Sequence, residues 1–159
     1  MLIADSWAEL SLRMGLATLV GALLGLDREL RGIDAGIRTN ALVSLSSAMV
    51  MICSLLLYDQ LHALDETNKT DPLRVIQGVA QAIGFIAAGL IFVRRNDVHN
   101  VTTAANLWVA AAVGIVAGLG QYKLLAIGTA FAILLLVSEP LFHRLRPDHG
   151  DRDTDEPAK

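Results

Sequence analysis

Two polar segments contain the residues whose types could do chemistry. The first, residues 25–39, interleaves aspartate, glutamate and arginine over a short stretch. The second, residues 94–108, combines two arginines with an aspartate, a histidine, two threonines and three asparagines. Carboxylates and histidine can transfer protons or bind metals, whereas arginine binds carboxylates and phosphates. The spacing within each segment decides which of these chemistries is available.

The carboxylates of the first segment are badly spaced for a shared metal ion. Asp27 and Glu29 are two residues apart, which puts them on different faces of a helix, and Arg28 and Arg31 offset their charge. Asp27 and Arg31, four residues apart, are instead expected to form an ion pair. In the second segment His99 is expected to be a solvated loop histidine, with a functional role as the alternative. We therefore predict no metal site and no cofactor.

Enzymatic and nucleic-acid functions find no support in the residues. The sequence contains no phosphate-binding glycine loop, no His-Glu-x-x-His and no Gly-x-Ser-x-Gly, so we predict that the protein is not an enzyme. Cys53 is the single cysteine, which excludes an intrachain disulfide and a cysteine zinc site. The net charge of -3 and the scattered arginines argue against a nucleic-acid partner.

The elements that position the two segments follow from where the charges lie. Hydrophobic residues make up 53% of the 159 residues and charged residues only 18%, and the charges are confined to clusters between apolar segments. A soluble domain distributes charge along every surface element. The pattern therefore predicts an all-α fold, a polytopic transmembrane bundle of about five helices.

The expected spans are measured against the roughly 20 residues that cross a hydrocarbon core. Two charge-free stretches fit directly, and a third follows a loop with Thr102 or Thr103 as N-cap. The first span must continue through Arg13 toward Trp7, which a Glu9–Arg13 pair four residues apart allows. The predicted spans are residues 7–26, 39–58, 75–93, 103–119 and 124–138.

The distribution of basic residues predicts the orientation. With the N-terminus outside, nine Lys and Arg residues lie inside and four outside, which favours an N-out, C-in topology. Both polar segments then lie on the inner side, where they could share one site, and residues 59–73 form an acidic outer loop. Residues 1–142 are expected to form the membrane domain, without a cleaved signal peptide. Residues 143–159 are expected to be a polar, disordered cytoplasmic tail with no soluble C-terminal domain.

Small residues recur on the predicted helices and favour close helix packing. The main interpretation is packing within one bundle, and a homodimer face is the alternative. Polar residues inside the spans are expected to face the bundle, although they could also line a polar path: Ser44, Ser46, Ser47, Gln77, Gln81 and Asn106. The residues predicted to pack helices are Gly21, Gly25, Gly84, Ala88, Gly114 and Gly118.

Several ordered motifs resemble those of the MgtC/SapB (YhiD-like) membrane proteins. They are Leu-Arg-Met-Gly-Leu-Ala from residue 12, Gly-Leu-Asp-Arg-Glu from residue 25, Ala-Gly-Ile-Arg-Thr from residue 35, Ile-Gly-Phe-Ile-Ala-Ala-Gly from residue 83 and Thr-Thr-Ala-Ala-Asn-Leu-Trp from residue 102. The resemblance implies a multi-pass protein of the bacterial inner membrane. Transferring the motifs residue by residue selects these candidate functional positions: Arg13, Asp27, Arg28, Glu29, Gly36, Arg38, Thr39, Thr102, Thr103, Asn106 and Trp108.

The function that the resemblance implies is adaptation to low magnesium, acid stress or survival in a host. The expected role is that of a non-enzymatic modulator that binds other membrane proteins, such as ATP synthase or a transport ATPase. The alternative is a transporter or channel for a small ion such as Mg²⁺ or H⁺. A conduit needs a continuous polar path, whereas a modulator needs only an exposed face.

Overall fold

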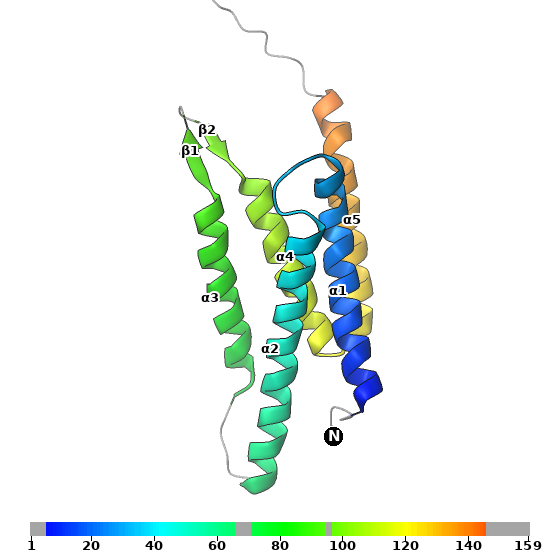
Figure 1. Cartoon of the computed structure of the whole chain (residues 1–159), viewed down its shortest axis with the longest axis vertical. Coiled ribbons are helices and arrows are strands. Elements are labelled where there is room, and N and C mark those ends of the chain that lie inside the picture. Colours follow the sequence, from blue (N-terminus) through cyan, green and yellow to red (C-terminus); the bar gives the residue numbers. More distant parts are fainter. Residues whose placement is uncertain (1–5, 66–70, 95–96, 146–159) are drawn as a thin grey trace, which may run out of the picture.

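A computed structural model describes residues 6–65, 71–94 and 97–145 of the chain. Five helices make up the fold: α1 (Trp7–Leu30), α2 (Ile37–Leu64), α3 (Leu73–Leu90), α4 (Val101–Gly118) and α5 (Tyr122–Leu145). A short antiparallel hairpin, β1 (Phe92–Arg94) with β2 (Asp97–His99), joins α3 to α4 (Figure 1). The first four helices are long and apolar enough to cross a membrane, and α5 contains a shorter apolar part, Tyr122–Ser138. The five-helix prediction is confirmed and supports a multi-pass membrane protein.

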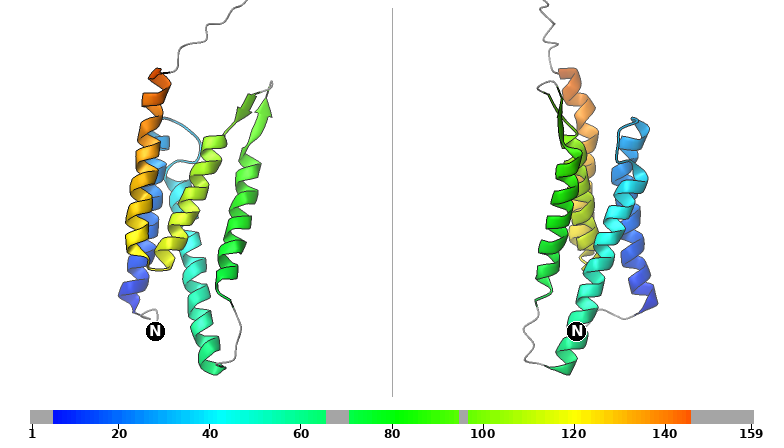
Figure 2. Two further views of the ribbon diagram at one scale, coloured as in Figure 1. Left: turned by 180° about the vertical axis from the view of Figure 1, so that it is seen from behind. Right: turned by 60° about the vertical axis from the view of Figure 1, so that its left-hand side comes forward.

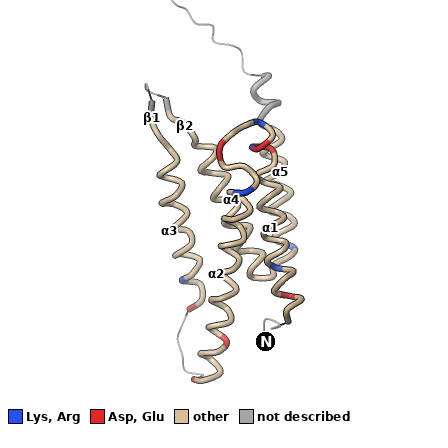
Figure 3. Tube along the Cα trace, in the orientation of Figure 1, with Lys and Arg blue, Asp and Glu red and all other residues tan. Residues whose placement is uncertain are grey.

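The helices alternate in direction, so the connecting segments gather at two ends (Figures 1 and 2). We call the end that carries β1, β2 and the 31–36 loop the hairpin end. The other, which carries the start of α1 and the α4–α5 turn, is the turn end. The long middle parts of α2, α3 and α4 contain no charged residue (Figure 3). Both polar segments of the sequence meet at the hairpin end, as predicted.

The core of the bundle forms around α4. Of its candidate membrane span 56% is buried, against 11% for α3. The residues at the centre are mostly small or branched aliphatic: Ala17, Val20, Leu24, Ala48, Ala110, Val113, Ala117 and Leu125. Lipid tails are as apolar as these side chains, so close van der Waals contact rather than water exclusion holds the helices together.

Glycines bring three of the helices into backbone contact. A Cβ atom on Gly25 would lie 2.5 Å from the Gly36 carbonyl oxygen, and one on Gly21 would lie 2.7 Å from the Asn40 carbonyl oxygen. On α4 a Cβ on Gly114 would overlap the Ser44 carbonyl oxygen. The helices α1 and α4 thus both press on α2, and no larger residue fits at these crossings.

Three predicted boundaries were wrong. The helix α2 continues past Asp59 to Leu64, so the predicted 59–73 loop is shorter and Asp59 is helical. The helix α3 ends at Leu90 rather than at residue 93, because β1 begins at Phe92, and β2 occupies residues that were expected to be loop. The helix α4 begins after Asn100, whose φ of 65° is left-handed, rather than after a threonine N-cap. The hydroxyl of Thr103 accepts a hydrogen bond from another helix instead.

The prediction that all polar residues in the spans face the bundle was wrong for half of them. Ser46, Gln77 and Gln81 are exposed, because α3 packs mainly on α4 through the opposite side, which includes Ile83 and Ala87. In the same way, a Cβ atom added to Gly84 would have no other atom within 4 Å, and Ala88 is exposed. These two small residues of α3 therefore do not pack against another helix of the described chain.

Candidate functional site

The buried guanidinium of Arg28 links three parts of the hairpin end. Only 3% of this residue is exposed. Its Nε donates a hydrogen bond to the Asp34 carbonyl oxygen at 3.0 Å, and its Nη2 donates to Thr103 Oγ1 on α4. A charge in such a place is tolerated only when hydrogen bonds replace its lost hydration. Arg28 therefore fixes the 31–36 loop against the start of α4.

The neighbouring carboxylates have different partners. Glu29 Oε2 accepts a hydrogen bond from the backbone N–H of Ile37 at 3.1 Å. Ile37 is the first residue of α2, and the positive end of the helix dipole stabilises a carboxylate there. The predicted ion pair of Asp27 with Arg31 is present at 2.9 Å. Gly36 allows the Glu29 contact, because a Cβ there would overlap the carboxylate. Among the described residues no three His, Cys, Asp or Glu side chains gather as metal ligands.

A row of buried polar side chains continues from Arg28 into the bundle. Asn106 Nδ2 of α4 donates to Asn40 Oδ1 of α2 at 3.0 Å and to the Leu24 carbonyl oxygen of α1 at 3.5 Å. Asn40 in turn donates to backbone carbonyls that precede α2, and Ser44 lies buried one turn further along α2. Sequence reasoning missed Asn40. Its position one helical turn before Ser44, at the start of an apolar stretch, was the signal that could have found it.

Four further candidate residues are exposed, three of them at the hairpin end and Trp108 about two turns into α4. Arg38 and Thr39 begin α2, and Thr102 and Trp108 lie on α4; all four are exposed, and we call them the hairpin-end surface. The Arg38 side chain makes none of the hydrogen bonds or ion pairs found within the described residues. These side chains are free to contact another molecule.

A polar pocket of about 290 Å³ lies beside this surface. It is lined by Arg28 and Ile33 together with residues 98–103, including His99. The His99 ring stacks on Phe92, its cross-strand partner, with ring centroids 5.2 Å apart. The hairpin thus holds the histidine at the rim, and its geometry suits recognition of a polar group rather than proton transfer between paired residues.

Arg13 belongs to a second cluster, at the turn end. Its Nε contacts Glu9 at 2.7 Å, the pair that the sequence predicted, and its Nη1 donates to the Gly118 carbonyl oxygen at 3.0 Å. The Tyr122 hydroxyl donates to the same carboxylate. Gly120, with a left-handed φ of 70°, leaves room for the guanidinium. This turn-end cluster ties α1 to the α4–α5 turn.

Replacing Tyr122 with phenylalanine is expected to weaken the attachment of α5. The change removes one hydrogen bond to a charged group and should lower the free energy of unfolding by about 1 kcal/mol. Chemical unfolding in mixed micelles measures this. Tyr58→Phe on α2, whose ring stacks on His62 within the same helix, is the control and should change stability by less than about 0.5 kcal/mol. Equal effects of both changes would contradict the role of the cluster.

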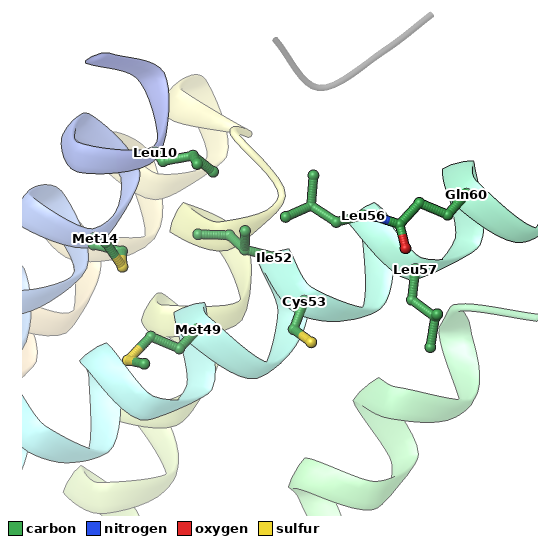
Figure 4. A pocket seen from close by; sticks show the side chains of 8 residues that line it. All are labelled: Leu10, Met14, Met49, Ile52, Cys53, Leu56, Leu57 and Gln60. Atoms are coloured by element: carbon green, nitrogen blue, oxygen red, sulfur yellow. The ribbon is translucent and has the colours of Figure 1, made fainter. Parts of the chain in front are cut away.

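An apolar groove of about 420 Å³ separates the ends of α1 and α2 near the turn end. Figure 4 shows Leu10 and Met14 of α1 across from Met49, Ile52 and Leu56 of α2. Its lining is almost free of polar groups, so it suits acyl chains of the bilayer. The groups that could recognise a specific ligand are instead at the hairpin end.

Comparison with known proteins shows which family the chain resembles. Residues 14–145 match the MgtC family. The chain is 38% identical over 138 residues to the "Putative magnesium transporter YhiD" of Escherichia coli (strain K12), which covers 87% of this chain and 62% of that protein. It is 36% identical over 132 residues to Protein SapB of Bacillus subtilis (strain 168), covering 81% and 53% respectively.

Protein MgtC of Salmonella typhimurium (strain LT2) is 37% identical over 107 residues, covering 67% of this chain and 42% of that protein. The chain therefore spans only about three fifths of YhiD and about half or less of SapB and MgtC. No solved structure matches it. The resemblance seen in the sequence motifs is confirmed: this chain belongs to the MgtC family of membrane proteins.

Proposed function

We propose that the protein is a non-enzymatic modulator of another membrane protein during adaptation to low magnesium, acid or host-associated stress. The observation that carries the proposal is the exposure of the four residues of the hairpin-end surface on the two helices, α2 and α4, that the buried hydrogen bonds of Arg28, Asn40 and Asn106 hold in place. A binding patch works best when its supporting residues are locked by packing and hydrogen bonds.

The chemistry of the hairpin-end surface suggests what the partner presents. Arg38 offers planar, charge-assisted hydrogen bonds to a carboxylate, and Trp108 offers a large apolar surface with one donor. A helix end or loop of a membrane protein with an acidic residue near the membrane border fits both groups. The membrane ATPases that the family resemblance implies are the first partners to examine. In the proposed N-out, C-in orientation this contact lies on the cytoplasmic side.

Replacing Arg38 with alanine is expected to abolish function without unfolding the protein. The side chain is exposed and outside the packing of the described bundle, so the free energy of unfolding should change by less than about 0.5 kcal/mol. The readout is growth of a deletion strain at low magnesium and at low pH, complemented with either form. Ser46→Ala, an exposed change on the same helix, is the matched control and should complement fully. Normal growth of the Arg38→Ala strain at normal abundance would contradict a role for Arg38.

Crosslinking and affinity capture from native membranes test the partner directly. A specific membrane protein should be captured by the native chain and lost with Arg38→Ala. Capture of nothing reproducible, or of the same proteins by both forms, would contradict the modulator proposal.

Ion transport is the second candidate, favoured by the buried polar row from Thr103 through Asn106 and Asn40 to Ser44. The name of the relative YhiD points in the same direction. Against it, the glycine crossings on either side of Ser44 leave no space for even one added carbon. Flux of Mg²⁺ or H⁺ in proteoliposomes, lost with Asn106→Leu, would favour transport over modulation.

A further inference from the structure

One face of α3 is open although it carries polar groups. Gln77, Gln81, Gly84 and Ala88 recur at helical spacing, and we call them the α3 face. Both glutamines and Ala88 are exposed, and a Cβ added to Gly84 would meet no atom within 4 Å. The side that packs on α4 lies away from this face, at Ile83 and Ala87.

Two glutamines on a membrane-crossing helix are poorly suited to face lipid. Each carboxamide has two donor hydrogens and an acceptor oxygen, and hydrocarbon satisfies none of them. Glutamines in such helices typically form hydrogen bonds to another helix, and small residues beside them let the two backbones approach. The α3 face has both features, and within the described chain no helix covers it. A helix from another molecule can.

We propose that the α3 face binds the α3 face of a second copy of this chain. Copies inserted in one membrane share an orientation, so two of them pair about a two-fold axis along the membrane normal, with the same patch on each side. Such a patch must be self-complementary. A carboxamide is self-complementary, because it has both hydrogen-bond donors and an acceptor. Gln81 of each copy can therefore form hydrogen bonds with Gln81 of the other.

The charges at the start of α3 also suit a second copy. Asp71 and Arg74 are both exposed there and carry opposite charges, so Arg74 of one copy can pair with Asp71 of the other. Beyond Arg74 the helix α3 carries no charged residue. The α3 face therefore has no net charge that would favour a strongly acidic or strongly basic partner over a second copy. This inference does not depend on the proposed function, since a dimer can form whether or not a partner protein binds at the hairpin end.

Cysteine crosslinking in native membranes tests the interface. In a Cys53→Ser background, Gln81→Cys and Ala88→Cys should each give a disulfide-linked dimer under mild oxidation, because only close Cα atoms can be bridged. Ile86→Cys is the matched control, since Ile86 is exposed on the same helix but on another side. Crosslinking at Ile86 equal to that at Gln81 and Ala88, or at none of them, would overturn the proposal.

Substitutions that a lone bundle tolerates separate the interface from folding. Gly84→Leu, and Gln77→Leu together with Gln81→Leu, meet open space in one copy and should leave folding intact. Each should weaken the dimer about tenfold or more, measured as the mass of the protein–detergent complex over a dilution series. A native protein that stays monomeric at every concentration, or variants that dimerise as well as the native chain, would overturn the proposal. A different protein captured at Gln81→Cys in place of a second copy would do the same.

Discussion

Gly114→Ala is expected to destabilise the bundle strongly. The added Cβ would overlap the Ser44 carbonyl oxygen and lie 2.8 Å from the Ser47 Cβ, so α2 and α4 must separate. The clash is with backbone, which cannot turn aside as a flexible side chain can. Overpacking of a tight core costs typically 1–3 kcal/mol, and we expect about 3 kcal/mol here. Gly114→Leu is expected to leave no folded protein.

The matched control is Gly15→Ala, which is not expected to lower the stability of the bundle. Gly15 on α1 is exposed, and a Cβ there meets no atom within 4 Å. Gly15→Ala should therefore leave stability unchanged or raise it by up to about 1 kcal/mol through helix propensity. Unfolding in mixed micelles, followed by Trp108 fluorescence in a Trp7→Phe background, measures both variants. A Gly114→Ala protein as stable as Gly15→Ala would mean that α2 and α4 do not meet at Ser44.

Features set by neighbouring residues could be predicted from the sequence. The helices follow from charge-free stretches, and the Glu9–Arg13 and Asp27–Arg31 pairs follow from a spacing of four residues. The end of α2 could not be predicted in this way. A helix of 28 residues is about 42 Å long, so it can cross the hydrocarbon core and continue past Asp59 into the interface. A charged residue marks the membrane border but does not end a helix.

Features set by contacts between distant residues could be predicted only in part. The shared side of the two polar segments follows from counting spans, but the partners of Arg28 and the role of Asn40 depend on how α1, α2 and α4 cross. The sequence pattern of Gly84 and Ala88 also resembles that of Gly21 and Gly25. Only the fold distinguishes them, because Gly25 meets Gly36 while Gly84 meets no part of the described chain.

Arg28→Ala is expected to impair both folding and function. The change removes the hydrogen-bond donor to the Asp34 carbonyl oxygen and to Thr103 Oγ1, of which the Thr103 hydroxyl is buried. Hydrogen bonds from a charged group are worth about 1.5–3 kcal/mol each, so we expect the loss of both to cost about 3 kcal/mol or more. Arg28→Lys should restore only part of it, since an ammonium lacks the planar fork that reaches both acceptors.

Two comparisons show whether that loss comes from the hydrogen bonds of the hairpin end. Thr103→Val alone should cost about 1.5–3 kcal/mol, because the buried guanidinium of Arg28 loses this acceptor. The Arg28→Ala and Thr103→Val changes should be less than additive, because both break the same bond. Arg38→Ala, an exposed arginine at the same end, should lose complementation at native stability, whereas Arg28→Ala should lose both. Additive effects of Arg28→Ala and Thr103→Val would mean that the α1–α4 bond does not form. Native stability of Arg28→Ala would mean that its guanidinium belongs to the exposed surface, because a buried group with these partners cannot be removed without cost.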